Sequence, residues 1–310
     1  MGSLRIIAGL VMSSTLLLAH ADMTPSVQPE QTQPVRMIVT VEARQGDQIP
    51  VLKQGDVMVF QNKQRLPVTS IVPAAGDCAA LELMILIDDA SGMSLGSQLG
   101  DLKRFIQDQP PETAIGVGYM RNGTIALAQG LTADHAAAAQ ALRLPTGSPG
   151  AMPSPFLSLS DVIKQWPPSS ARHEVVLISS GIDPLGGGVA DPYLYAAIEQ
   201  AQRAGVVVYA IYTPSAGHGG HSFWRLEWGQ NHLAQIAEET GGEAYMLGLE
   251  PPVAFQPYLA DMSAHLSHQY LVNFLIAPRA KAGFQQVRLT TEVPNAELVH
   301  AGRVYVPASR

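Results

Sequence analysis

Cysteine is almost absent from this sequence, and charged residues are scarce. Cys78 is the single cysteine among 310 residues, so no disulfide can form within the chain and the fold depends on its apolar core. Apolar residues make up 46% of the chain, which supplies such a core, and charged residues make up only 15%. Lys and Arg number 19 against 26 Asp and Glu, a net charge of -7. This balance argues against a nucleic-acid partner, which needs a basic stripe.

Two phosphate-binding signatures are also missing. The chain has no Gly-x-x-x-x-Gly-Lys-Ser/Thr loop, and it has no Gly-x-Gly-x-x-Gly that opens a helix after a strand. Nucleotide chemistry is therefore not expected.

An apolar run opens the chain, and no later segment is long and apolar enough to span a membrane. Arg5 precedes the stretch Ile6–Leu18, and Ala19-His20-Ala21 offers a small-residue cleavage site, which together are typical of a secretory signal peptide. We predict residues 1–21 as that signal, and hence an exported protein in the periplasm or outside the cell. A retained membrane anchor is the alternative. Cleavage removes Arg5 as the only charged residue, so the net charge changes from -7 to -8.

Four segments follow the signal. Residues 22–34 lack periodicity and are predicted as a flexible lead-in. Residues 35–78 alternate apolar stretches with polar turns, which predicts an N-terminal β segment. Residues 79–266 alternate strands with helices, which predicts an α/β domain with a doubly wound, mostly parallel sheet. Residues 267–310 show strands without helices and are predicted to pack with the N-terminal segment as an accessory β unit.

The pattern also predicts individual elements of the α/β domain. The near-continuous apolar run Leu81–Ile87 predicts a strand buried on both faces. Strands at 114–120 and 124–128 are joined through Asn122-Gly123, a tight-hairpin signal, so one strand is antiparallel. The predicted helices cover residues 99–109, 133–143, 159–166, 193–204, 231–240 and 255–266.

The loop after the first strand of this domain carries the candidate chemistry. Asp88, Asp89 and Ser91 follow the carboxyl end of the strand, where ligands bind in open parallel sheets, and their oxygens suit Mg²⁺. The loop resembles the Asp-x-Ser-x-Ser start of the metal-ion-dependent adhesion site of the von Willebrand factor A family. The order of elements over residues 79–266 is similar to that family too. The resemblance implies a non-enzymatic protein-binding or assembly module.

A secreted, acidobacterial-type subgroup of this family is similar beyond the α/β domain. The shared phrases are the stretch from Val-Leu-Lys-Gln-Gly-Asp-Val at residues 51–57 to Asn-Lys at 62–63, Gln-Tyr-Leu at 269–271 and Tyr-x-Pro at 305–307. Their common order along most of the chain carries the resemblance.

The metal site departs from the family pattern in both registers. If Asp88 is the motif aspartate, Ala90 and Gly92 occupy the hydroxyl positions. If Asp89 is the motif aspartate, Ser91 supplies one hydroxyl and Met93 replaces the other. We predict a degenerate site, which either binds Mg²⁺ weakly through Asp88, Asp89 and Ser91 or stays free of metal.

A second departure lies on a later strand. The family's Thr-Asp-Gly is replaced by a stretch with Ser180 in the place of the aspartate, and no threonine follows Thr146 in the loop before the third helix. Asp183 is the nearby carboxylate that could reach back to the site.

An overlapping motif suggests an enzyme as the alternative. Gly-Met-Ser-Leu-Gly at residues 92–96 fits the nucleophile elbow of serine hydrolases, with Ser94 as nucleophile. An elbow places the serine directly on the strand-to-helix turn, yet four residues separate the end of the predicted strand from Gly92. The oxyanion-like stretch at 218–220 also follows the serine instead of preceding it. A periplasmic serine hydrolase is therefore the second hypothesis.

The segment 217–224 holds two histidines and several aromatic neighbours. His218 and His221 are three apart, but a zinc site needs further ligands, and none with evident spacing accompanies them. We interpret the segment as a Gly-rich loop anchored by Phe223, Trp224 and Trp228. These aromatics either contact a protein partner or cover the end of the sheet. The predicted partner-binding residues are Ser180, Asp183, His218, His221 and Trp224. A structural domain whose recognition site was lost is the remaining alternative.

Overall fold

The computed structural model describes residues 32–148, 150–186, 188–216, 221–277 and 279–308. The predicted signal peptide and His218 lie outside these residues. None of the described helices is long and apolar enough to cross a membrane.

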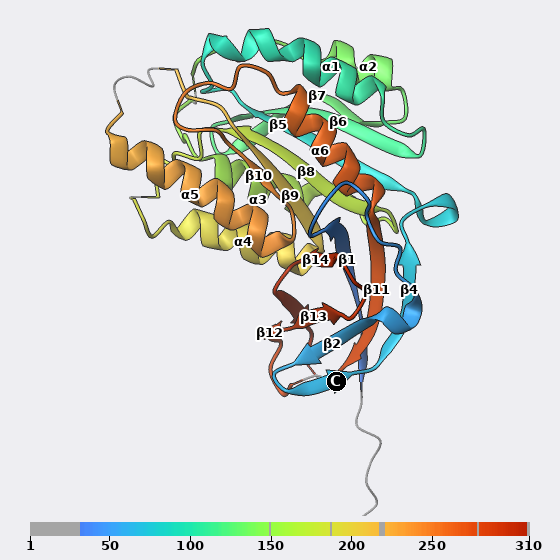
Figure 1. The fold of residues 1–310 in the computed structure, drawn as a ribbon. Coiled ribbons are helices and arrows are strands. Elements are labelled where there is room, and N and C mark those ends of the chain that lie inside the picture. Colours follow the sequence, from blue (N-terminus) through green and yellow to red (C-terminus); the bar gives the residue numbers. More distant parts are fainter. Residues whose placement is uncertain (1–31, 149, 187, 217–220, 278, 309–310) are drawn as a thin grey trace, which may run out of the picture. The chain divides into compact units, whose positions relative to one another are not determined.

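A six-stranded sheet forms the centre of the α/β part (Figure 1). Five of its strands are parallel, and β7 pairs antiparallel with β6 at one edge. The hairpin between them turns at Asn122 and Gly123, which both have positive φ (56° and 68°), as a type I′ turn requires. The strands, in spatial order, are β10 (Ala244–Tyr245), β9 (Val206–Tyr212), β8 (Arg172–Ser179), β5 (Leu81–Asp88), β6 (Thr113–Arg121) and β7 (Thr124–Thr132).

Helices cover both faces of this sheet, which buries side chains from both sides of β5. Each face has its own apolar cluster, and the side chains of β5 alternate between the two clusters. One face is covered by α1 (Leu99–Gln107), α2 (His135–Gln140) and α6 (Gln256–Ser267). The other face is covered by α3 (Pro155–Gln165), α4 (Pro192–Ala204) and α5 (Phe223–Thr240). The predicted doubly wound fold class is confirmed.

The strands of the β unit come from both ends of the described chain. In the four-stranded sheet β14-β1-β11-β4, the early strand β1 lies between two late strands and pairs antiparallel with each. A shared apolar core lies beneath these strands, and the predicted accessory β unit is thereby confirmed. The early strands are β1 (Gln33–Ala43), β2 (Val57–Gln61), β3 (Gln64–Leu66) and β4 (Val68–Pro73). The late strands are β11 (Gln269–Ile276), β12 (Gly283–Gln286), β13 (Arg288–Thr291), β14 (Ala296–His300) and β15 (Arg303–Val306).

Several predicted limits were wrong. β1 begins at Gln33, so the end of the predicted lead-in belongs to a strand. α2 is shorter than its predicted range 133–143. α5 begins at Phe223 and not at Asn231, because Ser222 caps it by accepting a hydrogen bond from the Arg225 amide. The domain limits near residues 78 and 266 stay predictions.

Candidate functional site

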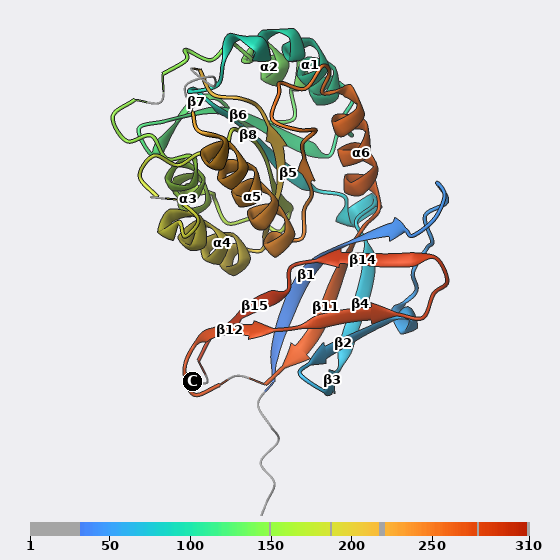
Figure 2. The ribbon, with the colours of Figure 1, turned by 60° about the vertical axis from the view of Figure 1, so that its left-hand side comes forward.

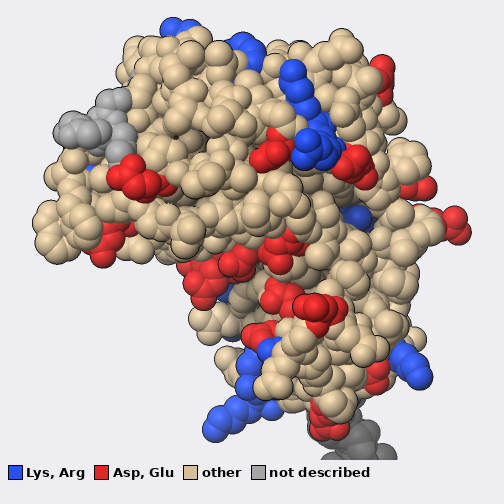
Figure 3. All heavy atoms as spheres, turned by 45° about the horizontal axis from the view of Figure 1, so that its top comes forward, with Lys and Arg blue, Asp and Glu red and all other residues tan. Residues whose placement is uncertain are grey.

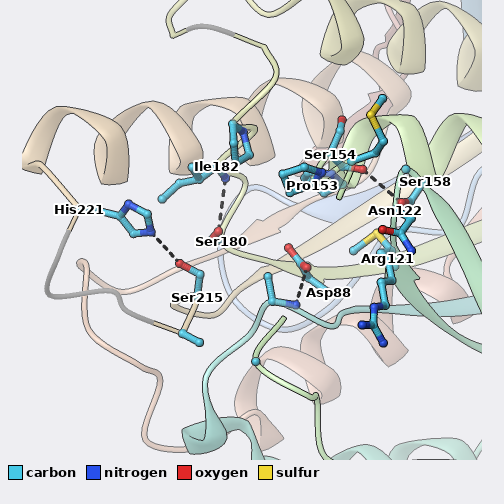
Figure 4. Close-up of a pocket in the computed structure, with 18 residues that line it drawn as sticks. Asp88, Arg121, Asn122, Pro153, Ser154, Ser158, Ser180, Ile182, Ser215 and His221 are labelled. Atoms are coloured by element: carbon cyan, nitrogen blue, oxygen red, sulfur yellow. Dashed lines mark hydrogen bonds between the residues drawn. The ribbon is translucent and has the colours of Figure 1, made fainter. Parts of the chain in front are cut away.

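A cavity lies at the carboxyl ends of the parallel strands, where the sequence placed the candidate site. Its volume is about 170 Å³, and its wall is formed by the ends of β5 and β6, the loops after β8 and β9, and the start of α3 (Figure 4). Such an edge is where open α/β sheets bind ligands. The polar residues that line it include Asp88, Ser154, Ser158, Ser180, Ser215 and His221.

Asp88, the last residue of β5, has both carboxylate oxygens engaged by its own chain. One oxygen accepts a hydrogen bond from the Ala90 amide at 2.9 Å, and the other accepts one from the Ser179 hydroxyl at 2.8 Å. Burial raises the pKa of Asp88 to about 6, and the nearby carboxylates of Asp89 and Asp183 act in the same direction. Asp88 therefore fixes the turn after β5 and faces the cavity as a weakly acidic group.

Asp89 forms a structural ion pair and does not line the cavity. Its oxygens accept hydrogen bonds from the Arg143 guanidinium at 2.8 and 3.2 Å and from the Thr146 amide at 2.9 Å. Burial alone would raise the pKa of Asp89, but these bonds outweigh burial and lower it. The Arg143 guanidinium also lies 3.6 Å from the ring centroid of Tyr119. The pair ties the loop before α3 to the end of β5.

Ser91 and Ser180 have different environments in the same neighbourhood. Ser91 is 1% exposed, and its hydroxyl oxygen has no hydrogen-bond partner among the described residues. Its backbone forms a β-bridge with Ser215 in the loop after β9. The Ser180 hydroxyl lines the cavity and accepts a weak hydrogen bond from the Ile182 amide at 3.4 Å.

Asp183 stabilises its own loop through hydrogen bonds. Its carboxylate accepts hydrogen bonds from the Ser154 hydroxyl and from the amides of Leu185 at 2.8 Å and Gly186 at 3.2 Å. It lines a neighbouring hollow beside Trp228. Asp183 was expected to reach back to the candidate metal site. Its carboxylate is instead held by the start of α3 and by the loop after β8.

These contacts limit the set of side chains that could bind a metal ion together. Among the described residues, no group of three or more His, Cys, Asp or Glu side chains is placed to hold an ion. Asp88 and Asp89 point to different partners, so the candidate ligands Asp88, Asp89 and Ser91 do not form one donor set. The donor set present does not fit a magnesium ion.

Ser94 does not sit on an elbow. It is exposed within a short 3-10 helix, Met93–Gln98, which starts after the turn that follows β5. In the described part of the chain no hydrogen bond joins Ser94 to a histidine. His221 contacts Ser215 instead, with 3.1 Å between Nε2 and the hydroxyl oxygen (Figure 4).

The aromatic residues near His221 belong to a helix and not to a loop. Phe223 and Trp224 form the first turn of α5, with exposed fractions of 60% and 61% and their rings in edge-to-face contact. Trp228 lies one turn further along and packs near Gly188 of the loop after β8. A capping serine directly before the aromatics was the sequence signal for this start.

Exposed apolar side chains gather at this end of the α/β part. Eleven large apolar residues are strongly exposed among those described, and eight of them lie in or beside the loops at the carboxyl ends of the strands. These eight are Met93, Leu144, Met152, Val189, Phe223, Trp224, Leu247 and Val253. Of this set, the sequence pointed to the aromatic residues Phe223 and Trp224 as partner contacts.

The comparisons with known proteins give no family assignment. No family model matches the chain, and no curated protein matches it. Among solved structures, it is similar to an aerotolerance-related membrane protein from Bacteroides fragilis, with 16% identity, a TM-score of 0.43 and coverage of 60% of this chain and 98% of that one. It is also similar to the SpRpn10 VWA domain, with 14% identity, a TM-score of 0.41 and coverage of 59% and 95%. At these values the likenesses carry no functional argument.

Proposed function

We propose that the α/β domain is an exported protein-recognition module of the von Willebrand factor A type, which binds its partner through the loops at the carboxyl ends of the parallel strands. The exposed apolar side chains on these loops carry the proposal. Large exposed apolar residues on one surface mark protein contact sites, and tryptophan is enriched at binding hot spots. Phe223 and Trp224 are the anchors of this surface because both are exposed on the capped first turn of α5.

The cavity itself is too small for the main contact. Its volume of about 170 Å³ lies below the roughly 300 to 1,000 Å³ of small-molecule sites. We assign it to one partner side chain that meets Asp88 and Ser180, while the surrounding loops make the larger contact. Recognition then needs no metal, since the candidate ligands are engaged by their own chain.

Site-specific photo-crosslinking in the native cell envelope tests this function. A photoreactive phenylalanine replaces Phe223 or Met93 on the recognition surface, and Val51 or Leu127 at exposed positions elsewhere. We expect one discrete crosslinked protein from the first pair only. When the photoreactive residue replaces Phe223, the additional substitution Trp224→Ala should reduce the yield of the crosslinked product by at least about tenfold. Equal crosslinking from all four positions, or none from the first pair, would contradict the proposal.

Two further measurements separate the alternatives. Labelling of the purified protein by a fluorophosphonate, with loss of labelling in Ser94→Ala, would support the hydrolase and not the module. Export predicts that the mature protein begins at Asp22, which N-terminal sequencing checks. A mature chain that retains residues 1–21 would support the membrane-anchor alternative.

A further inference from the structure

A second cleft lies away from the recognition loops, between α4, β8, β1 and β15. Its volume is about 340 Å³, which falls within the range of ligand sites. Residues 31–310 form one compact unit, so the α/β part and the β unit share this cleft. Figure 2 shows β15 and β12 on the side of β1 that faces away from β4.

The charge of this cleft is opposite to that of the chain. Four arginines line it, and no Asp or Glu is among the described residues of its wall. The whole chain, in contrast, carries a net charge of -7. On the face of the molecule in Figure 3, acidic side chains gather where the β unit meets the α/β part. The four arginines are Arg36, Arg172, Arg203 and Arg303.

Two of these arginines have no carboxylate partner in the described chain. Arg172 pairs with Glu174 at 3.5 Å, and Arg303 pairs with Glu239 at 2.7 Å. The exposed Arg36 only donates to the Ser170 carbonyl at 3.0 Å. The exposed Arg203 guanidinium lies 4.0 Å from the ring centroid of Tyr305. The aromatic face orients Arg203 without neutralising it.

The same cleft exposes an unpaired edge of β1. The ladder between β1 and β11 covers Gln33 to Thr40, but the ladder between β1 and β14 starts only at Val39. The Val41 amide donates to the His268 carbonyl on the β11 side, at 3.0 Å. Because hydrogen-bonded residues alternate in an antiparallel pair, the backbone groups of Arg36 and Ile38 point to the other side. That side is the cleft.

β15 borders the cleft from the opposite wall. Val304 and Tyr305 line it, and the one described ladder partner of β15 is β12. β1 and β15 contact each other without pairing, and residues of both strands line the cleft. On the wall formed by α4, the buried Gln202 has a side-chain carbonyl oxygen without a described partner. The cleft offers backbone groups, an amide oxygen and positive charge together.

We infer that this cleft binds an extended acidic peptide segment, which adds as a strand to the free edge of β1 and places its carboxylates against Arg36 and Arg203. An unpaired strand edge selects an extended main chain, and side-chain contacts then set specificity. Guanidinium groups bind carboxylates through charge-assisted hydrogen bonds. The segment of β1 from Pro34 to Ile38 accommodates about five residues of such a peptide.

Fluorescence anisotropy with defined peptides tests this inference. The probe is a fluorescein-labelled peptide of four Glu-Thr repeats, and the comparison peptides are four Lys-Thr repeats and the acidic peptide N-methylated at alternate residues. We expect the acidic probe to bind and both comparison peptides to bind at least about tenfold more weakly. The charge reversals Arg36→Glu and Arg203→Glu should each weaken binding of the acidic peptide by at least about tenfold.

Control variants separate a specific loss of peptide binding from effects of net charge or misfolding. Arg65→Glu reverses an exposed charge on β3 outside the cleft, and it should change the affinity by less than about twofold. Trp224→Ala should leave peptide binding unchanged, because the recognition surface is separate. Circular dichroism of each variant confirms that it is folded.

Three results would overturn the inference. The first is no binding of the acidic peptide at up to about 1 mM. The second is equal binding of the N-methylated peptide together with displacement by succinate or phosphate, which would identify a small-anion site without strand pairing. The third is an equal loss in Arg65→Glu and in the two cleft variants, which would reflect only the net charge.

Discussion

Glu174 in β8 is a carboxylate without any solvent exposure. It is contacted by the Arg172 guanidinium at 3.5 Å and by the Gln269 amide at 3.3 Å. Burial raises the pKa of Glu174 from 4.5 to about 7, although both neighbours lower it. Since the native pKa is above the unfolded one, the stability that this group contributes is present below pH 4.5 and is lost as the pH rises through about 7.

Glu174→Gln should remove this pH dependence. Between pH 4.5 and pH 8, the free energy of unfolding of the variant should increase relative to the wild type, by on the order of 3 kcal/mol. Urea unfolding at several pH values measures the difference. Glu199→Gln, at an exposed position of α4, controls for the loss of one acidic side chain. A difference between Glu174→Gln and wild type that stays constant with pH would contradict the prediction.

Asp88 and Asp89 lead to a second prediction at the residue scale. Because one is bound by Ser179 and Ala90 and the other by Arg143, the two carboxylates do not face a common position for an ion. We expect millimolar Mg²⁺ or Mn²⁺ to change the melting temperature by less than about 1 °C, since only a ligand selective for the folded state stabilises it. A saturable rise that disappears in Asp88→Asn but persists in Asp47→Asn would show that a metal binds.

The sequence could place Asp88 and Ser180 together but could not predict the partner of Asp89. Asp88 ends β5 and Ser180 follows β8, and the carboxyl ends of these neighbouring parallel strands share an edge. Arg143 is 54 positions from Asp89, and no local pattern indicates their pairing. The motif therefore appeared as two adjacent candidate ligands, whereas the fold separates them.

At the scale of elements, α5 packs directly on the backbone of the loop after β8. A Cβ atom at Gly229 would lie 2.4 Å from the Ser180 carbonyl oxygen, and one at Gly181 would lie 2.1 Å from the Gly229 carbonyl oxygen. Gly181 also has a φ of +67°, which disfavours any other residue. The glycines therefore allow α5, with its exposed Phe223 and Trp224, to lie against the loop that ends β8.

Two Gly-to-Ala variants with opposite expected effects test this close approach. Gly229→Ala should destabilise the protein by about 1 to 3 kcal/mol, because the clash is with backbone and outweighs the helical preference of alanine. Gly100→Ala in α1, where a Cβ meets nothing within 4 Å, should stabilise it by about 0.5 to 1 kcal/mol. Thermal or urea unfolding measures both. Two changes of the same sign would contradict the packing argument.

The start of α5 shows where element prediction failed. The apolar periodicity was evident only from Asn231 onward, and the glycines before His221 suggested a continuing loop. The first turns of α5 bury Leu226 but leave Phe223 and Trp224 exposed, so they lack the apolar stripe that marks a helix. Only the Ser222 cap indicated the true start. The exposed first turn of α5 is thus the part of the helix least visible to apolar periodicity.

At the scale of the whole molecule, early and late strands of the described chain meet in one sheet. The sequence predicted that late strands would join early ones, because both segments are rich in strands and neither carries helices. The sequence could not predict the register of these strand pairs. Apolar and polar residues alternate with a period of two, so a shift of one strand by two residues leaves the same side chains facing the core. In the structure, Val39 of β1 pairs with Tyr270 of β11 and with His300 of β14.

This topology predicts what removal of residues 269–310 would do. β1 would lose both neighbours, and its side chains Met37, Val39 and Val41, at most 5% exposed, would be uncovered. Strands β5 to β10 would keep every ladder partner. We therefore expect hydrogen exchange to rise throughout residues 33–73 while β5, β8 and β9 stay protected. The chain should also become prone to aggregation through the bare edges of β1.

A shorter truncation provides the control. Ending the chain after Pro307 removes no strand, so its exchange pattern should match that of the full chain. If the long truncation left residues 33–73 protected, the early strands would be stable without the late ones, and the β unit would not depend on both chain ends. If it also exposed β5, β8 and β9, the two parts would unfold together, because removing Gln269 breaks its contacts with Arg172 and Glu174. Exchange measured strand by strand distinguishes these outcomes, which a single melting temperature would combine.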